Sequence, residues 1–203
     1  MSNYKWLLDA GHGGILNGKY TTAPAKMHRF PDGFEVMEGV TNRAIARKLW
    51  KLLEAQGIDF GLVYDEQLDT SLEARVAIAD RLYAKDKRVI YLSIHSNAGG
   101  GRGFEVFTSP GQNRSDMVAE VFCNSYHRHF PNRPLRSDKA DGDADKEADF
   151  YVLRKTDCPA VLVENLFFDN REEAEYLVSE VGQQEIAQCM FDAIMEVEKL
   201  KPI

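Results

Sequence analysis

Four residues of the types that bind metals or transfer protons lie at the ends of segments that we expect to form strands or helices. His12 follows a short apolar run, His95 ends a second run, Glu164 ends a third, and Glu38 begins an amphipathic stretch. Two imidazoles and a carboxylate brought together are typical of zinc hydrolases, in which three protein ligands leave one coordination position for water. This set of residues therefore predicts metal-assisted hydrolysis.

Spacing alone leaves the role of each carboxylate open. A glutamate at a helix start, such as Glu38, also has a structural explanation, because negative charge there interacts favourably with the helix dipole. A single histidine at the end of a strand is more often structural, but His12 and His95 after two separate strands strengthen the metal interpretation. Which of Glu38 and Glu164 binds a metal, and which acts as a base, is not decided at this level.

The elements that must position these residues alternate between short apolar runs and amphipathic helices. The expected strands are Trp6–Leu8, Ile58–Tyr64, Val89–His95, Gly103–Thr108, Phe150–Arg154 and Ala160–Glu164. The expected helices are Glu38–Gln56, Ser71–Lys85, Ser115–Phe130 and most of the chain from Arg171 onward. Between the first strand and the first helix, Pro24 and Pro31 favour a polar loop.

This alternation predicts the α/β fold class. We expect a single three-layer domain over residues 1–203, with a mostly parallel, twisted sheet and helices on both faces. The nearly continuous apolar character of Val89–His95 is typical of a strand covered on both faces. Ligands of such sheets bind beyond the carboxyl ends of the strands, where His12, His95 and Glu164 are expected to converge.

Composition excludes several classes of protein. The chain has 203 residues, and its 25 Lys and Arg against 32 Asp and Glu give a net charge of -7. An acidic chain without clustered basic residues is a poor nucleic-acid binder, and no apolar run is long enough for an integral membrane segment. The three cysteines lie far apart and lack CxxC spacing, so free thiols are expected rather than a disulfide framework or a cysteine-rich zinc module.

Four motifs, in order along the chain, resemble those of zinc-dependent N-acetylmuramoyl-L-alanine amidases of the amidase-3 type. They are LLDAGHGG at Leu7–Gly14, EGVTNRAIARKL at Glu38–Leu49, SIHSNA at Ser93–Ala98 and PAVLVENLFFDN at Pro159–Asn170. Their order and separations agree with the family over nearly the whole chain. One such motif would be weak evidence for the resemblance, whereas four motifs in the same order are strong evidence for it.

The resemblance implies a role for each candidate residue. His12, Glu38 and His95 would be ligands of Zn²⁺, and Glu164 would be the catalytic carboxylate. Glu35 lies three residues before Glu38, but Glu38 stands four residues before Asn42, as in the family motif. The reaction implied is hydrolysis of the amide between the lactyl group of N-acetylmuramic acid and L-alanine in peptidoglycan.

Other residues receive structural expectations. We expect Arg75 to form an ion pair, and Asn42 and Asn97 to cap backbone groups rather than to support the ligands. Asp138–Asp149 is a charged loop before a strand, and it could border the substrate groove. Leu166 occupies a position where the family often has glycine, which is expected to reshape that groove.

Two other functions fit parts of the pattern. A zinc carboxypeptidase would need an arginine to bind a terminal carboxylate, and a non-catalytic peptidoglycan-binding domain would lack a ligand or the base. The N-terminus shows no secretory signal, and no separate cell-wall-binding domain is evident. We therefore expect a protein made in the cytoplasm that resembles a phage or prophage lysin and acts at the bacterial cell wall after release.

Overall fold

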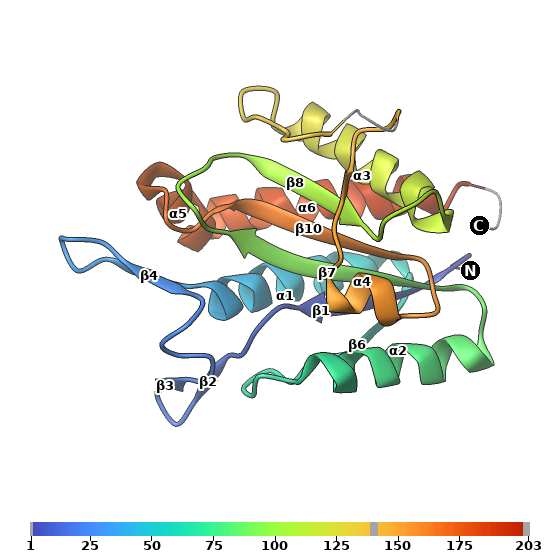
Figure 1. Cartoon of the computed structure of the whole chain (residues 1–203), viewed down its shortest axis with the longest axis horizontal. Helices are drawn as coiled ribbons and strands as arrows, with labels where there is room; N and C mark the ends of the chain where they lie inside the picture. Colours follow the sequence, from blue (N-terminus) through green and yellow to red (C-terminus); the bar gives the residue numbers. More distant parts are fainter. Residues whose placement is uncertain (1, 139–141, 201–203) are drawn as a thin grey trace.

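The computed structural model describes residues 2–138 and 142–200, which form a three-layer α/β domain (Figure 1). Its central sheet has six strands in the order β6-β1-β7-β10-β8-β9. The first four strands of this order run parallel, β8 is antiparallel to β10, and the short β9 is parallel to β8. The sheet strands are β1 (Lys5–Ala10), β6 (Asp59–Leu62), β7 (Val89–Asn97), β8 (Phe104–Thr108), β9 (Lys146–Glu147) and β10 (Ala160–Phe167).

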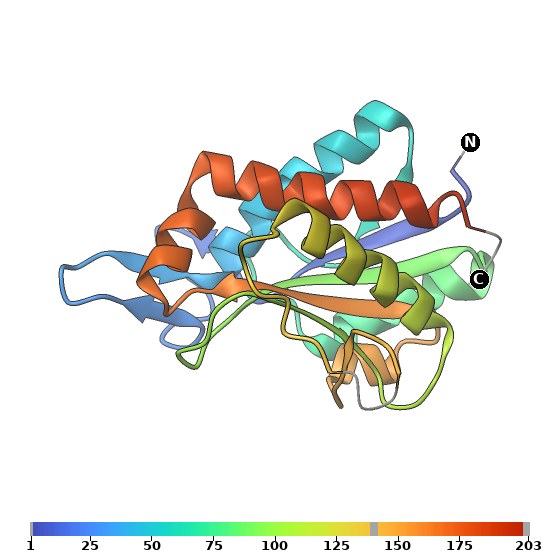
Figure 2. The same cartoon turned by 90° about the horizontal axis from the view of Figure 1, so that it is seen from above.

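Helices cover both faces of this sheet, as Figure 2 shows from above. One face packs against α1, α3 and α6, and the other packs against α2 and the short α4. The helices are α1 (Glu38–Gln56), α2 (Leu72–Lys85), α3 (Arg114–His129), α4 (Tyr151–Lys155), α5 (Arg171–Val178) and α6 (Glu180–Val197). The sequence-based prediction of a three-layer domain with a mostly parallel sheet is therefore confirmed.

Side chains along the strands alternate between the two faces of the sheet. On one face they change from apolar to polar toward the carboxyl ends of the strands. On β1, β7 and β10, every second residue packs into the core beneath α1, α3 and α6. The intervening positions begin with apolar residues beneath α2 and α4, such as Leu7, Tyr91 and Leu162. Because alternate residues share a face, Asp9, His95 and Glu164 project from that same second face.

Local signals in the sequence place the helix ends. Gly57 adopts the left-handed conformation that ends α1, with φ of 67°, and the Ser71 side chain accepts a hydrogen bond from the Ala74 amide at the start of α2. In the C-terminal half, the cysteines are free and buried, as expected. Within the described ranges, none of the helices has the combination of length and apolar character that crossing a membrane requires.

Two parts of the sequence-based prediction are wrong. Phe150–Arg154 was expected to be a strand, but α4 occupies Tyr151–Lys155, because an apolar run of four residues fits one helical turn as well as a strand. The loop before α1 contains two short hairpins that were not expected, β2 (Ile15–Leu16) with β3 (Lys19–Tyr20), and β4 (Met27–Arg29) with β5 (Glu35–Met37). The second hairpin projects from the domain and leads directly into α1 (Figure 1).

Ile186 on α6 provides a test of the larger core. Its side chain is fully buried, whereas Val181 on the same helix is 64% exposed. We expect Ile186→Ala to lower the free energy of unfolding by about 2–5 kcal/mol, because it removes buried methyl groups and leaves a cavity. Val181→Ala, the control, should change it by less than about 0.5 kcal/mol in denaturant titrations. Equal effects of the two substitutions would contradict the packing described here.

Candidate metal centre

Three side chains from separate segments meet at the carboxyl edge of the sheet. His12 lies just after β1, His95 lies near the end of β7, and Glu38 is the first residue of α1. The metal-binding atoms that these residues offer all lie within 4.8 Å of one another, and this is the one such cluster among the described residues. Glu38 Oε1 is 3.0 Å from His95 Nδ1, and Glu38 Oε2 is 3.2 Å from His12 Nε2.

Two glycines allow the three segments to approach so closely. A Cβ on Gly11 would lie 2.1 Å from the His95 ring, and a Cβ on Gly39 would lie 2.1 Å from the Gly13 carbonyl oxygen. Side chains at these positions would therefore push β7 or α1 away from the His12 loop. Gly11 in the motif after β1 and Gly39 in α1 are thus explained by close approach.

The donor atoms of this cluster suit a metal cation. Glu38 is 1% exposed, and burial alone would raise the pKa of its carboxyl group. Hydrogen bonds and charge from His12 and His95 outweigh burial and lower that pKa far below its ordinary value. The His12 Nε2 atom is buried and faces Glu38 Oε2 at 3.2 Å, and it has no further hydrogen-bond partner among the residues that the structure describes. An imidazole nitrogen and a carboxylate oxygen this close together can both coordinate one cation.

Glu164 lies beside the three residues on the neighbouring strand. Its Cα pairs with that of His95 in the β7–β10 register, so the two side chains project from adjacent strands on one face. Burial raises the pKa of Glu164 to about 8, against the lowering effect of His95. Within the described chain, its buried Oε2 atom has no hydrogen-bond partner. This carboxyl group can therefore exchange a proton near neutral pH.

A buried ion pair between α2 and β1 holds the loop that contains His12. Arg75 on α2 pairs with Asp9, and it donates further hydrogen bonds to the carbonyl oxygens of Ala10 (2.9 Å) and His12 (3.0 Å). Burial would raise the pKa of Asp9, but Arg75 and a hydrogen bond from Tyr91 help to hold it below its ordinary value of 3.8. The ion pair expected for Arg75 is present, and it also positions the backbone of a candidate ligand.

Arg43 holds the same loop from the side of α1. Its guanidinium donates hydrogen bonds to the carbonyl oxygens of Gly11, His12 and Gly13, and the one to His12 is 2.7 Å long. The Arg43 residue is 1% exposed. The spacing of the sequence did not single out Arg43 or Asp9, because their roles depend on contacts between distant segments.

The cluster opens into a pocket of about 430 Å³. Its apolar wall is made by Leu72 at the start of α2, by Leu162, and by Phe150 and Tyr151 at the start of α4. Its polar lining includes His12, His95, Glu164, Lys26, Asp69, Thr70, Ser71 and Arg75. A concave site with apolar walls and a few convergent polar groups is the usual form of an active site.

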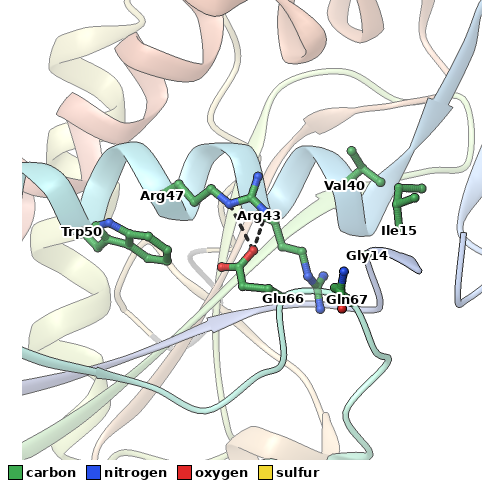
Figure 3. A pocket seen from close by; sticks show the side chains of 8 residues that line it. All are labelled: Gly14, Ile15, Val40, Arg43, Arg47, Trp50, Glu66 and Gln67. Carbon is green, nitrogen blue, oxygen red and sulfur yellow. Dashed lines mark hydrogen bonds and ion pairs between the residues drawn. The ribbon is translucent and has the colours of Figure 1, made fainter. Parts of the chain in front are cut away.

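A second hollow of about 510 Å³ lies along α1, as Figure 3 shows. It is lined by Gly14, Ile15, Val40, Arg43, Arg47, Trp50, Glu66 and Gln67. Arg47 and Glu66 form an ion pair there, with Arg47 Nε 3.0 Å from Glu66 Oε2, and Trp50 lies beside them (Figure 3). The metal-binding cluster and Glu164 open into the other pocket, so that pocket is the candidate active site.

The remaining expectations have mixed outcomes. Both amides bond backbone groups as expected, since Asn42 donates to the Gly11 carbonyl oxygen at 3.4 Å and Asn97 accepts from the Ala98 amide at 2.8 Å. Asn42 also donates to Glu38 Oε1 at 3.4 Å, so it contacts a candidate ligand, and Asn97 also donates to Glu105. Leu166 adopts a left-handed backbone with φ of 62°, which explains why glycine suits this position, but its side chain fills the core beneath α1, α3 and α6. Within Asp138–Asp149, residues 139–141 lie outside the described chain, and Lys146–Glu147 form β9.

Fold and site together define an α/β domain in which a His/Glu/His cluster that could hold a metal ion lies beside a buried carboxyl group. The sequence profile of the amidase-3 family, described as N-acetylmuramoyl-L-alanine amidase, matches residues 7–196. The chain therefore belongs to the N-acetylmuramoyl-L-alanine amidase family, and the resemblance drawn from its four motifs is confirmed. Membership makes it a hydrolase of peptidoglycan.

Relatives of known role are similar over almost all of this chain. The endolysin of Bacillus phage SPP1 is 29% identical over 206 residues, covering 99% of this chain and 68% of the endolysin. The N-acetylmuramoyl-L-alanine amidase CwlM of Bacillus licheniformis is 31% identical over 183 residues, covering 90% of this chain and 64% of CwlM. The chain thus spans about two thirds of the length of these relatives.

Solved structures share the fold. The amidase AmiC2 of Nostoc punctiforme superimposes with a TM-score of 0.76 at 26% identity and covers 98% of both chains. The amidase Ami1 of Mycobacterium smegmatis superimposes with a TM-score of 0.78 at 21% identity and covers 97% of both chains. The second similarity concerns the fold alone.

Asp9 provides a test of the support beneath the site. We expect Asp9→Asn to lower the free energy of unfolding at neutral pH by about 3–5 kcal/mol, because it removes the buried carboxylate from the Arg75 charge and leaves only the partly exposed Asp69, 3.6 Å away. The pKa of Asp9 is lowered in the folded protein, so its contribution is complete above its ordinary value of 3.8 and is lost as the pH falls below it. The difference from the wild type should therefore shrink in acid.

Denaturant titrations at neutral pH and near pH 3 measure this difference. Ser93→Ala is the matched control, since it removes only the 2.8 Å hydrogen bond to Asp9, and we expect a loss of about 1 kcal/mol. A constant difference between Asp9→Asn and the wild type at both pH values would show that the Asp9 charge contributes nothing.

Proposed function

We propose that this amidase is zinc-dependent, with His12, Glu38 and His95 as the metal ligands and Glu164 as the general base and acid. The bond cleaved is the amide between the lactyl group of N-acetylmuramic acid and L-alanine. The observation that carries the proposal is the convergence of the metal-binding atoms of the three ligand candidates within 4.8 Å, beside a pocket that is lined by His12, His95 and Glu164.

The donor set favours zinc. Two imidazoles and one carboxylate are the ligands of many catalytic zinc sites, which keep a fourth position for water. When bound, Zn²⁺ lowers the pKa of water to about 7 and polarises the scissile carbonyl. The chain's own contribution is to hold the ligands in place, with Arg43 and Arg75 fixing the His12 backbone and Glu38 anchored at the start of α1.

Glu164 transfers the proton in this proposal. Its unpartnered Oε2 atom accepts the proton of the attacking water and returns it to the nitrogen of the leaving L-alanine. The raised pKa of Glu164 suits both steps, because the group must first accept a proton and then hold it until the amide bond breaks. The apolar wall formed by Phe150, Tyr151 and Leu162 borders the site of this exchange.

The structure gives the carboxypeptidase alternative no support. The arginine that lines the pocket is Arg75, which is 2% exposed and already engaged by Asp9 and by backbone carbonyl oxygens. The binding-domain alternative would require a missing ligand or base, and all four residues are present in the site. Similarity to the phage SPP1 endolysin supports a further proposal, that this enzyme serves as a lysin acting at the cell wall.

Glu164→Gln tests the proposed base. We expect the variant to bind zinc as the wild type does and to lose at least about 10³-fold in kcat, because the amide cannot accept the proton. Mass spectrometry of digested peptidoglycan measures the reaction as stem peptides that begin at L-alanine. Substantial activity in Glu164→Gln would remove Glu164 from the mechanism, and single amino acids among the wild-type products would favour a carboxypeptidase.

Glu38→Gln tests the proposed ligand set. We expect it to reduce zinc affinity by about 10–100-fold or more, because a neutral amide replaces a buried carboxylate between two histidines. Metal content after dialysis against a chelator, measured by atomic emission, gives the result without relying on activity. His127→Ala is the matched histidine control, since His127 is exposed on α3. Equal metal content in both variants would refute the assignment of Glu38.

A further inference from the structure

Lys26 enters the candidate active-site pocket from the loop before β4. It is an exposed residue at the mouth, and the pocket that it lines also contains Glu164, His12 and His95. The Lys26 side chain is therefore placed to meet a substrate that lies over the metal centre.

The backbone of Lys26 is fixed relative to the metal centre. Its carbonyl oxygen accepts hydrogen bonds from the Glu38 amide (2.9 Å) and from the Tyr20 hydroxyl (3.2 Å). Lys26 also has a left-handed backbone with φ of 57°, a conformation that a lysine adopts less readily than glycine. An ordered lysine in this conformation at a site is a reason to look for a role of its side chain.

The charges of the pocket leave Lys26 free for a ligand. Two cationic residues line the pocket, and one of them, Arg75, is buried and engaged by Asp9. Lys26 forms no ion pair or side-chain hydrogen bond within residues 2–138 and 142–200. An amino group of this kind at the edge of an active site is suited to an anionic group of the substrate.

The peptide on the leaving side of the scissile bond carries such a group. L-Alanine is followed in peptidoglycan stems by a D-glutamate that is linked through its γ-carboxyl, so its α-carboxyl is either a free carboxylate or an amide. This group lies one residue beyond the reacting nitrogen, which is within about 7 Å for an extended chain. A lysine side chain spans a similar distance.

We propose that Lys26 binds the free α-carboxylate of this second stem-peptide residue and makes the enzyme select acidic over amidated stems. The inference rests on the amidase function proposed above and names a specificity-determining residue for it. A carboxylate gains a charge-assisted hydrogen bond from Lys26, whereas the neutral amide gains a weaker one. The selectivity follows from this difference.

The experiment compares two N-acetylmuramoyl tripeptides, L-alanyl-γ-D-glutamyl-L-lysine and its form amidated at the glutamate α-carboxyl. For the wild type we expect kcat/KM to be at least about tenfold higher on the acidic substrate, the size of one charge-assisted hydrogen bond. Lys26→Met keeps an unbranched side chain of nearly the same length and removes the charge, so this ratio should fall below about 2. Lys26→Arg should retain most of the preference, since it retains the charge.

Two controls separate specificity from stability and from catalysis. Lys51→Met makes the same substitution at an exposed lysine on α1 and should keep the wild-type ratio. Calorimetric binding to the Glu164→Gln protein should show the acidic tripeptide binding more tightly, with the difference abolished when Lys26→Met is added. This measurement does not depend on turnover.

The outcomes distinguish the two proposals. A wild-type ratio near 1, or an equal loss on both substrates in Lys26→Met, would overturn the role of Lys26 and leave the amidase function intact. Failure of the wild type to release stem peptides from either tripeptide or from whole peptidoglycan would overturn the proposed function and this inference together. A ratio that depends on the charge at position 26 would establish the inference.

Discussion

The backbone carbonyl oxygens of the loop after β1 are directed into the protein, and two buried arginines supply the donors that they need. Arg75 reaches them from α2 and Arg43 reaches them from α1, so the loop is held from opposite layers of the domain. A buried carbonyl without a donor is costly, and a buried guanidinium without acceptors is more costly still. The two requirements are met together, and the position of His12 depends on both.

The alternation of side chains on the sheet and the positions of two helix starts explain how a concave site forms at the sheet edge. The strands present alternating side chains, and the face beneath α2 and α4 changes from apolar to polar toward the carboxyl ends. Leu162 and Glu164 on β10 are neighbours on this face. Leu162 packs beneath the helices and contributes to the apolar wall of the pocket, whereas Glu164 belongs to its polar lining. The helices α2 and α4 begin at the pocket rim, so their starts form its wall instead of covering it.

Periodicity along the sequence predicted most of the sheet and the longer helices, because burial on one face imposes a regular spacing. It failed for the five-residue helix α4, whose short apolar run has no distinctive period. The positions of His12, His95 and Glu164 followed from the ends of strands, whereas the choice of Glu38 came from the family motif. Arg43 and Lys26 were not visible as site residues, since only tertiary contacts bring their side chains to the loop and the pocket.

The order of strands in the sheet differs from their order along the chain. β10, the last strand in sequence, lies in the interior between β7 and β8, and it carries Glu164. A nascent chain that has emerged only as far as β8 contains His12, Glu38 and His95 but has neither the carboxylate nor the strand that joins β7 to β8. The cluster and the carboxyl group are therefore brought together only late in synthesis, because a chain that ends before residue 160 lacks both β10 and Glu164.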